Sequence, residues 1–289
     1  MNRLFAIVCL VLLTQFTWSQ KPSHRIFSGE GDSVVYQQLL EQLSGNDLVF
    51  FGELHNNPIC HWLQIELTAD LFRQFGQDLV LGAEMFEADD QLILDEYLKG
   101  YIQEKNFREE AKLWTNYSTD YRPLVEFARE HDLSFIATNI PRRYASMVAG
   151  GGFVALDTLS DRARQYIAPL PIEYDSELPG YKKMLKMGHM HGSKKRAKNL
   201  PRAQAIKDAT MAHFILKHLN RKGIFLHYNG TYHSNDHEGI VWYIKQHAPE
   251  LKVVTIATVE QENPGKLKKE NQGLADFVLV VDSDMTRTY

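Results

Sequence analysis

Ionisable side chains follow four strand-like segments of this sequence, directly where each segment ends. Glu53 and His55 follow the first segment, Glu84 the second, Arg142 the third and His233 the fourth. The carboxyl ends of parallel strands meet at one edge of a sheet, and ligands of open α/β sheets bind outside that edge. The sequence therefore predicts a site at which these side chains converge.

Two carboxylates and two histidines suit two kinds of chemistry. They are the groups of general acid–base catalysis, and they also hold divalent metals. We therefore take Glu53, His55, Glu84 and His233 both as candidate catalytic residues of a hydrolase and as candidate metal ligands. The structural alternative is an ion-paired edge that stiffens the strand ends.

Two further residues near these strand ends have open assignments. Arg142 could anchor an anionic group with its planar guanidinium, or it could be the solvated start of a helix. His61 falls in the first turn of a predicted helix, and it faces either the site or the core. His227 lies inside a predicted strand, which favours a core position.

The segment Pro169–Pro201 is the second informative region. It is rich in Tyr, Met, Lys and His and has no clean period, which predicts a loop-rich or helical lid. Haem requires an axial Tyr, His or Met and cations for its propionates. The lid residues that could contact haem are Tyr174, Tyr181, Met187, His189 and His191, and Arg142 is a candidate from outside the lid. The alternative is a solvated basic loop.

The overall pattern predicts one large α/β domain. The chain has 289 residues, of which 44% are hydrophobic and 24% charged, and its net charge of -4 does not favour a nucleic-acid partner. Apolar strands alternate with amphipathic helices, which predicts a mostly parallel sheet with helices on both faces. Residues 21–31 are polar and are expected to fray. In the helix that begins at Pro58, the stripe expected to face the sheet is Trp62, Ile65, Ala69 and Phe72.

The first residues are typical of a secretory signal peptide. Arg3 precedes the short apolar run Leu4–Leu13, and small residues at 17–19 offer a cleavage site. We expect a signal peptide at 1–19 and a domain at 20–289 that contains the lid at 169–201. Cys9 lies inside the apolar run, so a lipid anchor there is not expected. Cleavage would leave Cys60 alone, without an internal disulfide partner.

Several motifs resemble the ChaN family of haem-binding uptake proteins, in the superfamily of TIKI and the erythromycin esterases. They occur in a specific order from about residue 48 to the end, as Gly52–Pro58 with His61, Gly82–Phe86, Tyr121–Leu124, Ala137–Arg142, Gln204–Ala212 and Asn229–His233. The resemblance implies an α/β fold, an envelope location and haem binding. It also implies two haems stacked within a dimer, with tyrosine as an axial ligand. Related hydrolases use an edge that matches Glu53, His55, Glu84 and His233.

The resulting functional hypothesis is an exported haem-binding protein of haem and iron uptake, in which the lid holds porphyrin over the sheet edge. It would be periplasmic or associated with the outer membrane, with an outer-membrane haem receptor and a second copy of the chain as partners. The alternatives are a hydrolase, with or without a divalent metal, and a fold used only for interaction. A serine hydrolase is poorly supported because no Gly-x-Ser-x-Gly motif is present.

Overall fold

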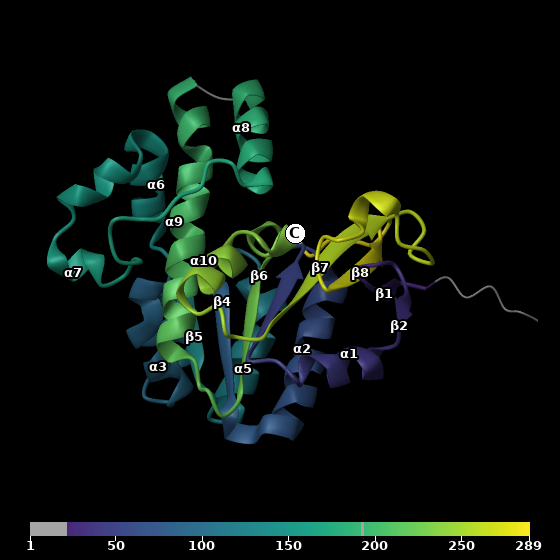
Figure 1. Ribbon diagram of the computed structural model, residues 1–289. Helices are drawn as coiled ribbons and strands as arrows, with labels where there is room; N and C mark the ends of the chain where they lie inside the picture. The colour runs from purple at the N-terminus through teal and green to yellow at the C-terminus, as the bar shows by residue number, and fades with distance from the viewer. Residues whose placement is uncertain (1–21, 192–193) are drawn as a thin grey trace, which may run out of the picture.

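The computed structural model describes residues 22–191 and 194–289, without the side chains of 187–197 (Figure 1). The signal peptide expected at 1–19 lies outside these residues. Within them, one sheet has the strand order β2-β1-β8-β7-β3-β6-β4-β5. The strands are β1 (His24–Ser28), β2 (Ser33–Val34), β3 (Leu48–Glu53), β4 (Leu79–Glu87), β5 (Phe135–Asn139), β6 (Ile224–Gly230), β7 (Val253–Gln261) and β8 (Phe277–Asp282).

The strands β3 to β8 run parallel, and β1 joins antiparallel to β8. This confirms the predicted mostly parallel sheet. The prediction that 21–31 frays is wrong, because His24–Ser28 pairs along β8 and buries Ile26 and Phe27. Pairing gives the backbone groups at that edge of β8 their partners, which a polar composition does not reveal.

Helices cover both faces of the sheet, as predicted (Figure 1). They are α1 (Tyr36–Leu43), α2 (Pro58–Phe75), α3 (Gln91–Leu98), α4 (Glu104–Glu110), α5 (Arg122–Glu130), α6 (Arg142–Gly151), α7 (Asp161–Arg164), α8 (Pro179–His191), α9 (Lys194–His218) and α10 (Ile240–His247). Alternate residues of a strand point to opposite faces. Val49 and Phe51 therefore join the core under α1 to α5, whereas Leu48 and Phe50 join the core under α9 and α10.

Helix α2 buries a different stripe from the predicted one. Trp62 is 50% exposed, and the buried stripe runs through Cys60, Leu63, Leu67 and Leu71. This stripe includes Gln64 and Thr68, whose polar groups bond to Glu53 and Tyr228. Apolar periodicity alone favoured the wrong side, because the true buried side carries polar residues that reach the site.

The lid, expected to be loop-rich or helical, contains two helices after a non-helical stretch at residues 169–178. These helices are α8 and the beginning of α9, which stand side by side above the sheet (Figure 1). We call this pair the helical lid. Pro201, the last residue of the predicted lid, lies inside α9, so this helix begins within the lid and continues beyond it. Ala203 and Ile206 pack against α6 in a small core that supports this extension. No helix among the described residues is long and apolar enough to cross a bilayer.

Candidate functional site

The predicted residues meet at the carboxyl edge, where the parallel strands end. Glu53 ends β3, Glu84 lies near the end of β4, and His233 lies in the short turn Thr231–His233 that follows β6. Strands β3, β6 and β4 are neighbours in the sheet, so these side chains project into one region. His55 lies two residues beyond β3 in the same region.

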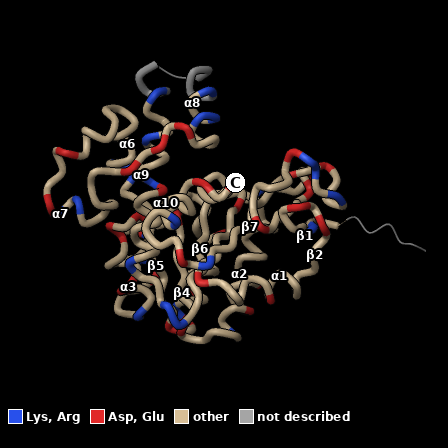
Figure 2. The backbone as a smooth tube through the Cα atoms, viewed as in Figure 1, with Lys and Arg blue, Asp and Glu red and all other residues tan. Residues whose placement is uncertain are grey.

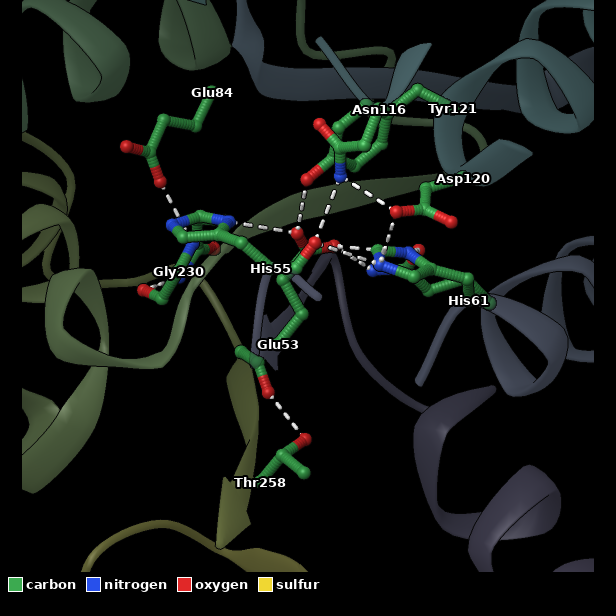
Figure 3. Close-up of polar contacts among 12 residues, drawn as sticks. Glu53, His55, His61, Glu84, Asn116, Asp120, Tyr121, Gly230 and Thr258 are labelled. Atoms are coloured by element: carbon green, nitrogen blue, oxygen red, sulfur yellow. Dashed lines mark hydrogen bonds and ion pairs between the residues drawn. The ribbon is translucent and has the colours of Figure 1, made fainter. Parts of the chain in front are cut away.

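Glu53 orients His55. The buried Glu53 carboxylate accepts hydrogen bonds from His55 Nδ1 at 2.8 Å, from the Tyr121 hydroxyl at 2.8 Å and from the Gln64 amide (Figure 3). Because Nδ1 donates to Glu53, the Nε2 atom of His55 is left as the second nitrogen, and it lies beside Gly230. The edge of the Trp114 ring, with its centroid 4.8 Å away, packs against the imidazole.

The pKa of His55 is raised. Burial alone would lower this pKa, but the hydrogen bond to Glu53 and the negative charges of Glu84 and Glu53 outweigh burial. The side chain remains 33% exposed. His55 is therefore a partly exposed imidazole in the cleft wall, with its Nε2 atom close to Gly230.

Gly230 allows the side chains of His55 and Glu84 to approach each other. A Cβ at this position would lie 2.6 Å from His55 Nε2 and 3.4 Å from Glu84 Oε2. The Gly230 N–H donates to Glu84 Oε2 at 2.7 Å. Both ionisable groups thus converge on the backbone of β6, which only glycine permits at this distance.

A second layer fixes the backbone of His55. The His55 carbonyl accepts from Asn116 Nδ2 at 2.9 Å and from His61 Nε2 at 3.1 Å. Asp120, which is buried, accepts from the same Asn116 amide at 2.6 Å and lies 3.5 Å from His61 Nε2 (Figure 3). His61, left open by the sequence, therefore supports the site from beneath.

His233 bridges two buried carboxylates. Its Nε2 atom lies 3.1 Å from Glu84 Oε1, and its Nδ1 atom lies 2.5 Å from Asp208 Oδ1. Burial would lower the pKa of His233, but the two carboxylates raise that pKa to about 9. Burial would raise the pKa of Glu84, but the charge of His233 holds it well below its usual range. His233 is thus an imidazolium at neutral pH.

Asp208 is a site residue that the sequence reasoning did not assign. It lies on α9, and its second oxygen accepts from the Tyr181 hydroxyl of α8 at 3.1 Å. The signal was a carboxylate within an apolar helical stretch, Asp208–Ala212. Asp208 and Tyr181 are both buried, with 0% and 4% of their surface exposed. The bridge therefore joins the sheet to both helices of the lid.

His227 occupies the core, as the sequence indicated. It is 1% exposed and bonds to Thr138 and Asn229. Burial lowers its pKa to about 4, which keeps the ring neutral. The neighbouring histidines of β6 and the following turn therefore carry different charges.

A cleft of about 1120 Å³ opens above the carboxyl edge. His55, Glu84 and His233 lie in its wall together with three aromatic residues, Trp114, Tyr232 and Tyr289. The lid contributes Lys183 and Met184 from α8 and Gln204 and Lys207 from α9. The predicted edge and the predicted lid thus enclose one cavity.

The lid residues predicted to bind haem have different positions. Tyr181 is buried against Asp208, and Tyr174 stacks on Tyr181 with ring centroids 5.5 Å apart, so neither ring is part of the cleft wall. The side chains of Met187, His189 and His191 lie outside the described residues. The tyrosines in the described wall of the cleft are Tyr232 and Tyr289.

Cations surround the cleft on the lid side. Figure 2 shows lysines and arginines on both lid helices. Lys183 lies 3.7 Å from Asp236, whereas Lys207 forms no ion pair with any described residue. Arg142 lines the cleft, ion-pairs with Glu87 and donates to the Lys112 carbonyl at 3.2 Å. Lys207 is the cation whose charge is most available to an anionic ligand.

The predicted divalent-metal site is not supported. No group of three or more His, Cys, Asp and Glu side chains in 22–191 and 194–289, as far as described, is arranged to hold a metal. The physical reason is pairing, because both ring nitrogens of His233 are occupied by Glu84 and Asp208. The hydrogen bonds to Glu53 likewise occupy that carboxylate.

The family follows from a match to a family model described as haem-binding uptake, Tiki superfamily, ChaN, which covers residues 39–244. The chain belongs to the ChaN family. ChaN of Campylobacter jejuni, solved in a study of cofacial haem binding, is 18% identical with a TM-score of 0.68, and the match covers 90% of this chain and 97% of that one. A Bacillus cereus protein is 11% identical with a TM-score of 0.50, over 84% and 90%. These likenesses show the fold, and no curated protein matches the chain.

Proposed function

We propose that this ChaN-family protein binds haem in the cleft between the carboxyl edge and the helical lid, and that it acts in haem uptake. The observation that carries the proposal is the cleft itself, because aromatic, cationic and tyrosine side chains line the same cavity in a member of a haem-binding family. The proposal places the ligand against Trp114, Tyr232 and Lys207.

The cavity suits a porphyrin in size and in lining. At about 1120 Å³, it exceeds the roughly 300–1,000 Å³ of pockets for drug-sized ligands. Its wall combines the aromatic rings with apolar Leu113, Ile140 and Met184. A flat macrocycle gains from such contacts because its faces and the rings both lose water.

Individual residues have distinct roles in this proposal. Tyr232, which lines the cleft and is 74% exposed, is the proposed iron ligand. Lys207 and Lys183 would pair with the propionates, and Arg142 would do so after leaving Glu87. Bound haem supplies the iron, whereas the protein supplies orientation and charge.

The biological setting is part of the same proposal. The signal-like segment at 1–19 favours export to the periplasm or the outer membrane, and an outer-membrane haem receptor would then be the source of haem. A homodimer is the proposed assembly, since family resemblance implies stacked haems. Fractionation of cells that express the full chain tests export, and light scattering with and without haemin tests dimerisation.

The ligand assignment has a direct test. Haemin is titrated into chain 20–289 and into Tyr232→Phe, and the Soret band is followed. We expect saturable binding by the wild type, with a weaker affinity and a changed spectrum in the variant. Tyr101→Phe is the matched control, because Tyr101 is 75% exposed and is not part of the cleft wall. Identical spectra for wild type and Tyr232→Phe would refute the ligand assignment.

A metal-free hydrolase is the second candidate, favoured by the His55–Glu53 pair. His55 Nε2 could remove a proton from water while Glu53 stabilises the resulting imidazolium, as in general base catalysis. Because the pKa of His55 is raised, the base form and hence the rate should increase as pH rises through this pKa. A panel of p-nitrophenyl esters tests the candidate with His55→Gln, and with His227→Gln as control. Hydrolysis that persists in His55→Gln would reject it.

A further inference from the structure

We propose that Tyr289, in the segment 283–289 that follows β8, forms part of the wall of the haem cleft and packs its ring against the face of the bound macrocycle. This inference rests on the proposed function and adds a binding residue to it. The Tyr289 side chain lines the cleft and is 62% exposed. Figure 1 marks this end of the chain beside the carboxyl edge.

The segment is fixed to the body of the protein just before Tyr289. The Thr288 N–H donates to the Asn56 carbonyl at 3.0 Å, and the Thr288 hydroxyl donates to Asp120 Oδ2 at 2.7 Å. Arg287 donates to Asn56 Oδ1 at 3.0 Å and pairs with Glu260 at 3.1 Å. Four contacts on two consecutive residues hold the backbone in place, so the position of Tyr289 is determined by the fold.

The residues that anchor this segment are the ones that support His55. Asn56 is its neighbour in sequence, and Asp120 accepts from Asn116, which in turn donates to the His55 carbonyl. Asp120 is 2% exposed, so its bond to Thr288 is shielded from water. Residues 287–288 and His55 are therefore parts of one hydrogen-bonded network.

An exposed ring held over a cleft indicates a binding role. Tyr289 and Tyr232 are both largely exposed, and both line the cleft from different segments. An aromatic side chain that is exposed to solvent in the free protein can bury its ring when a flat ligand binds. A planar macrocycle is the ligand class that suits such a ring, because stacking buries more surface when the ligand has an extended flat face.

The roles of the two tyrosines differ, and the difference can be measured. Tyr289 acts through its ring, so Tyr289→Phe should retain wild-type affinity for haemin. Tyr289→Ala should weaken binding about tenfold, which corresponds to an aromatic contact of about 1.4 kcal/mol. Tyr101→Ala is the control for loss of an exposed tyrosine, and its affinity should be unchanged.

The experiment is a haemin titration of the wild type and these three variants, followed by the Soret band, with unfolding midpoints to show that each variant folds. Equal affinity of Tyr289→Ala and wild type would overturn this inference and leave the proposed function intact. An equal loss in Tyr289→Phe and Tyr289→Ala would also overturn it, because the hydroxyl would then carry the contact. Absence of saturable binding by the wild type would refute the proposed function and this inference together.

Discussion

Two histidine–carboxylate units lie at the same sheet edge, and they differ in how many ring nitrogens remain available. His55 donates from one nitrogen to Glu53, its other nitrogen approaches Gly230 without a hydrogen bond to a described residue, and 33% of its side chain is exposed. His233 is buried and has both nitrogens occupied, by Glu84 and by Asp208. The first unit is therefore available for a ligand or a reaction, whereas the second joins the sheet to the lid.

The largest expected effect concerns the second unit. Asp208→Asn removes one anionic partner of a buried imidazolium and weakens the acceptor of Tyr181. We expect a loss of unfolding free energy of about 3 kcal/mol, because breaking a buried ion pair leaves uncompensated charge. Urea denaturation measures this loss, and the exposed Asp157→Asn is the control. A loss of unfolding free energy no larger than that of Asp157→Asn would show that the bridge does not hold the lid.

The second prediction uses pH. The pKa of His233 is raised to about 9 in the folded state from the usual value of 6.5 for a histidine. The stabilisation by His233 is therefore complete below pH 6.5 and is lost as pH rises through 9, by up to about 3 kcal/mol. His227 acts with the opposite sign, because its pKa is lowered to about 4, so it destabilises the fold as pH falls below 6.5 and has no effect near pH 9. Unfolding free energies at pH 6 and pH 9.5 should differ in the wild type and agree more closely in His233→Gln.

The third prediction concerns the point where the two units meet. Gly230→Ala places a Cβ 2.6 Å from His55 Nε2, so the imidazole must move. We expect a cost of about 1–2 kcal/mol, typical of overpacking, together with a change in the NMR titration of His55. Gly150→Ala is the control, because a Cβ there meets nothing within 4 Å. An unchanged His55 titration would mean that Gly230 does not define the position of the ring.

The smallest effect on stability is expected for the first unit. His55→Gln removes the donor to Glu53, although Tyr121 and Gln64 continue to donate to that carboxylate. A net cost of about 1 kcal/mol is expected for one lost hydrogen bond. Urea denaturation of both variants compares the unfolding free energy lost in His55→Gln with that lost in Asp208→Asn. A loss as large as that of Asp208→Asn would erase the distinction between the two units.

Part of this site could be predicted from the sequence because strand ends obey a simple rule. Glu53, Glu84 and His233 each follow or end a strand, so a parallel sheet brings them together whatever the helices do. Asp208 lies on a helix far away in sequence. Its approach to His233 depends on the angle at which α9 packs on the sheet, and no local sequence pattern encodes this packing angle.

The lid and α2 show the same limit in another form. Composition located the lid but not its helices, because its mixed Lys, Met and Tyr content lacks an apolar period. Trp62 was assigned to the core by periodicity, although α2 buries the stripe that carries Gln64. The burial of Gln64 is stabilised by its bond to Glu53, a long-range contact invisible to a local pattern. A long-range polar contact therefore decided which side of α2 is buried.

The central claim is that haem binds in the cleft, and Lys207, which lines the cleft and forms no ion pair with a described residue, tests it most directly. Haemin is titrated into the wild type, Lys207→Ala and Lys217→Ala, since both lysines lie on α9 but only Lys207 lines this cleft. We predict saturable binding by the wild type, roughly tenfold weaker binding by Lys207→Ala, as expected for the loss of a charge-assisted contact, and unchanged binding by Lys217→Ala. Equal affinity of all three proteins, or no saturable binding by any of them, would contradict the claim.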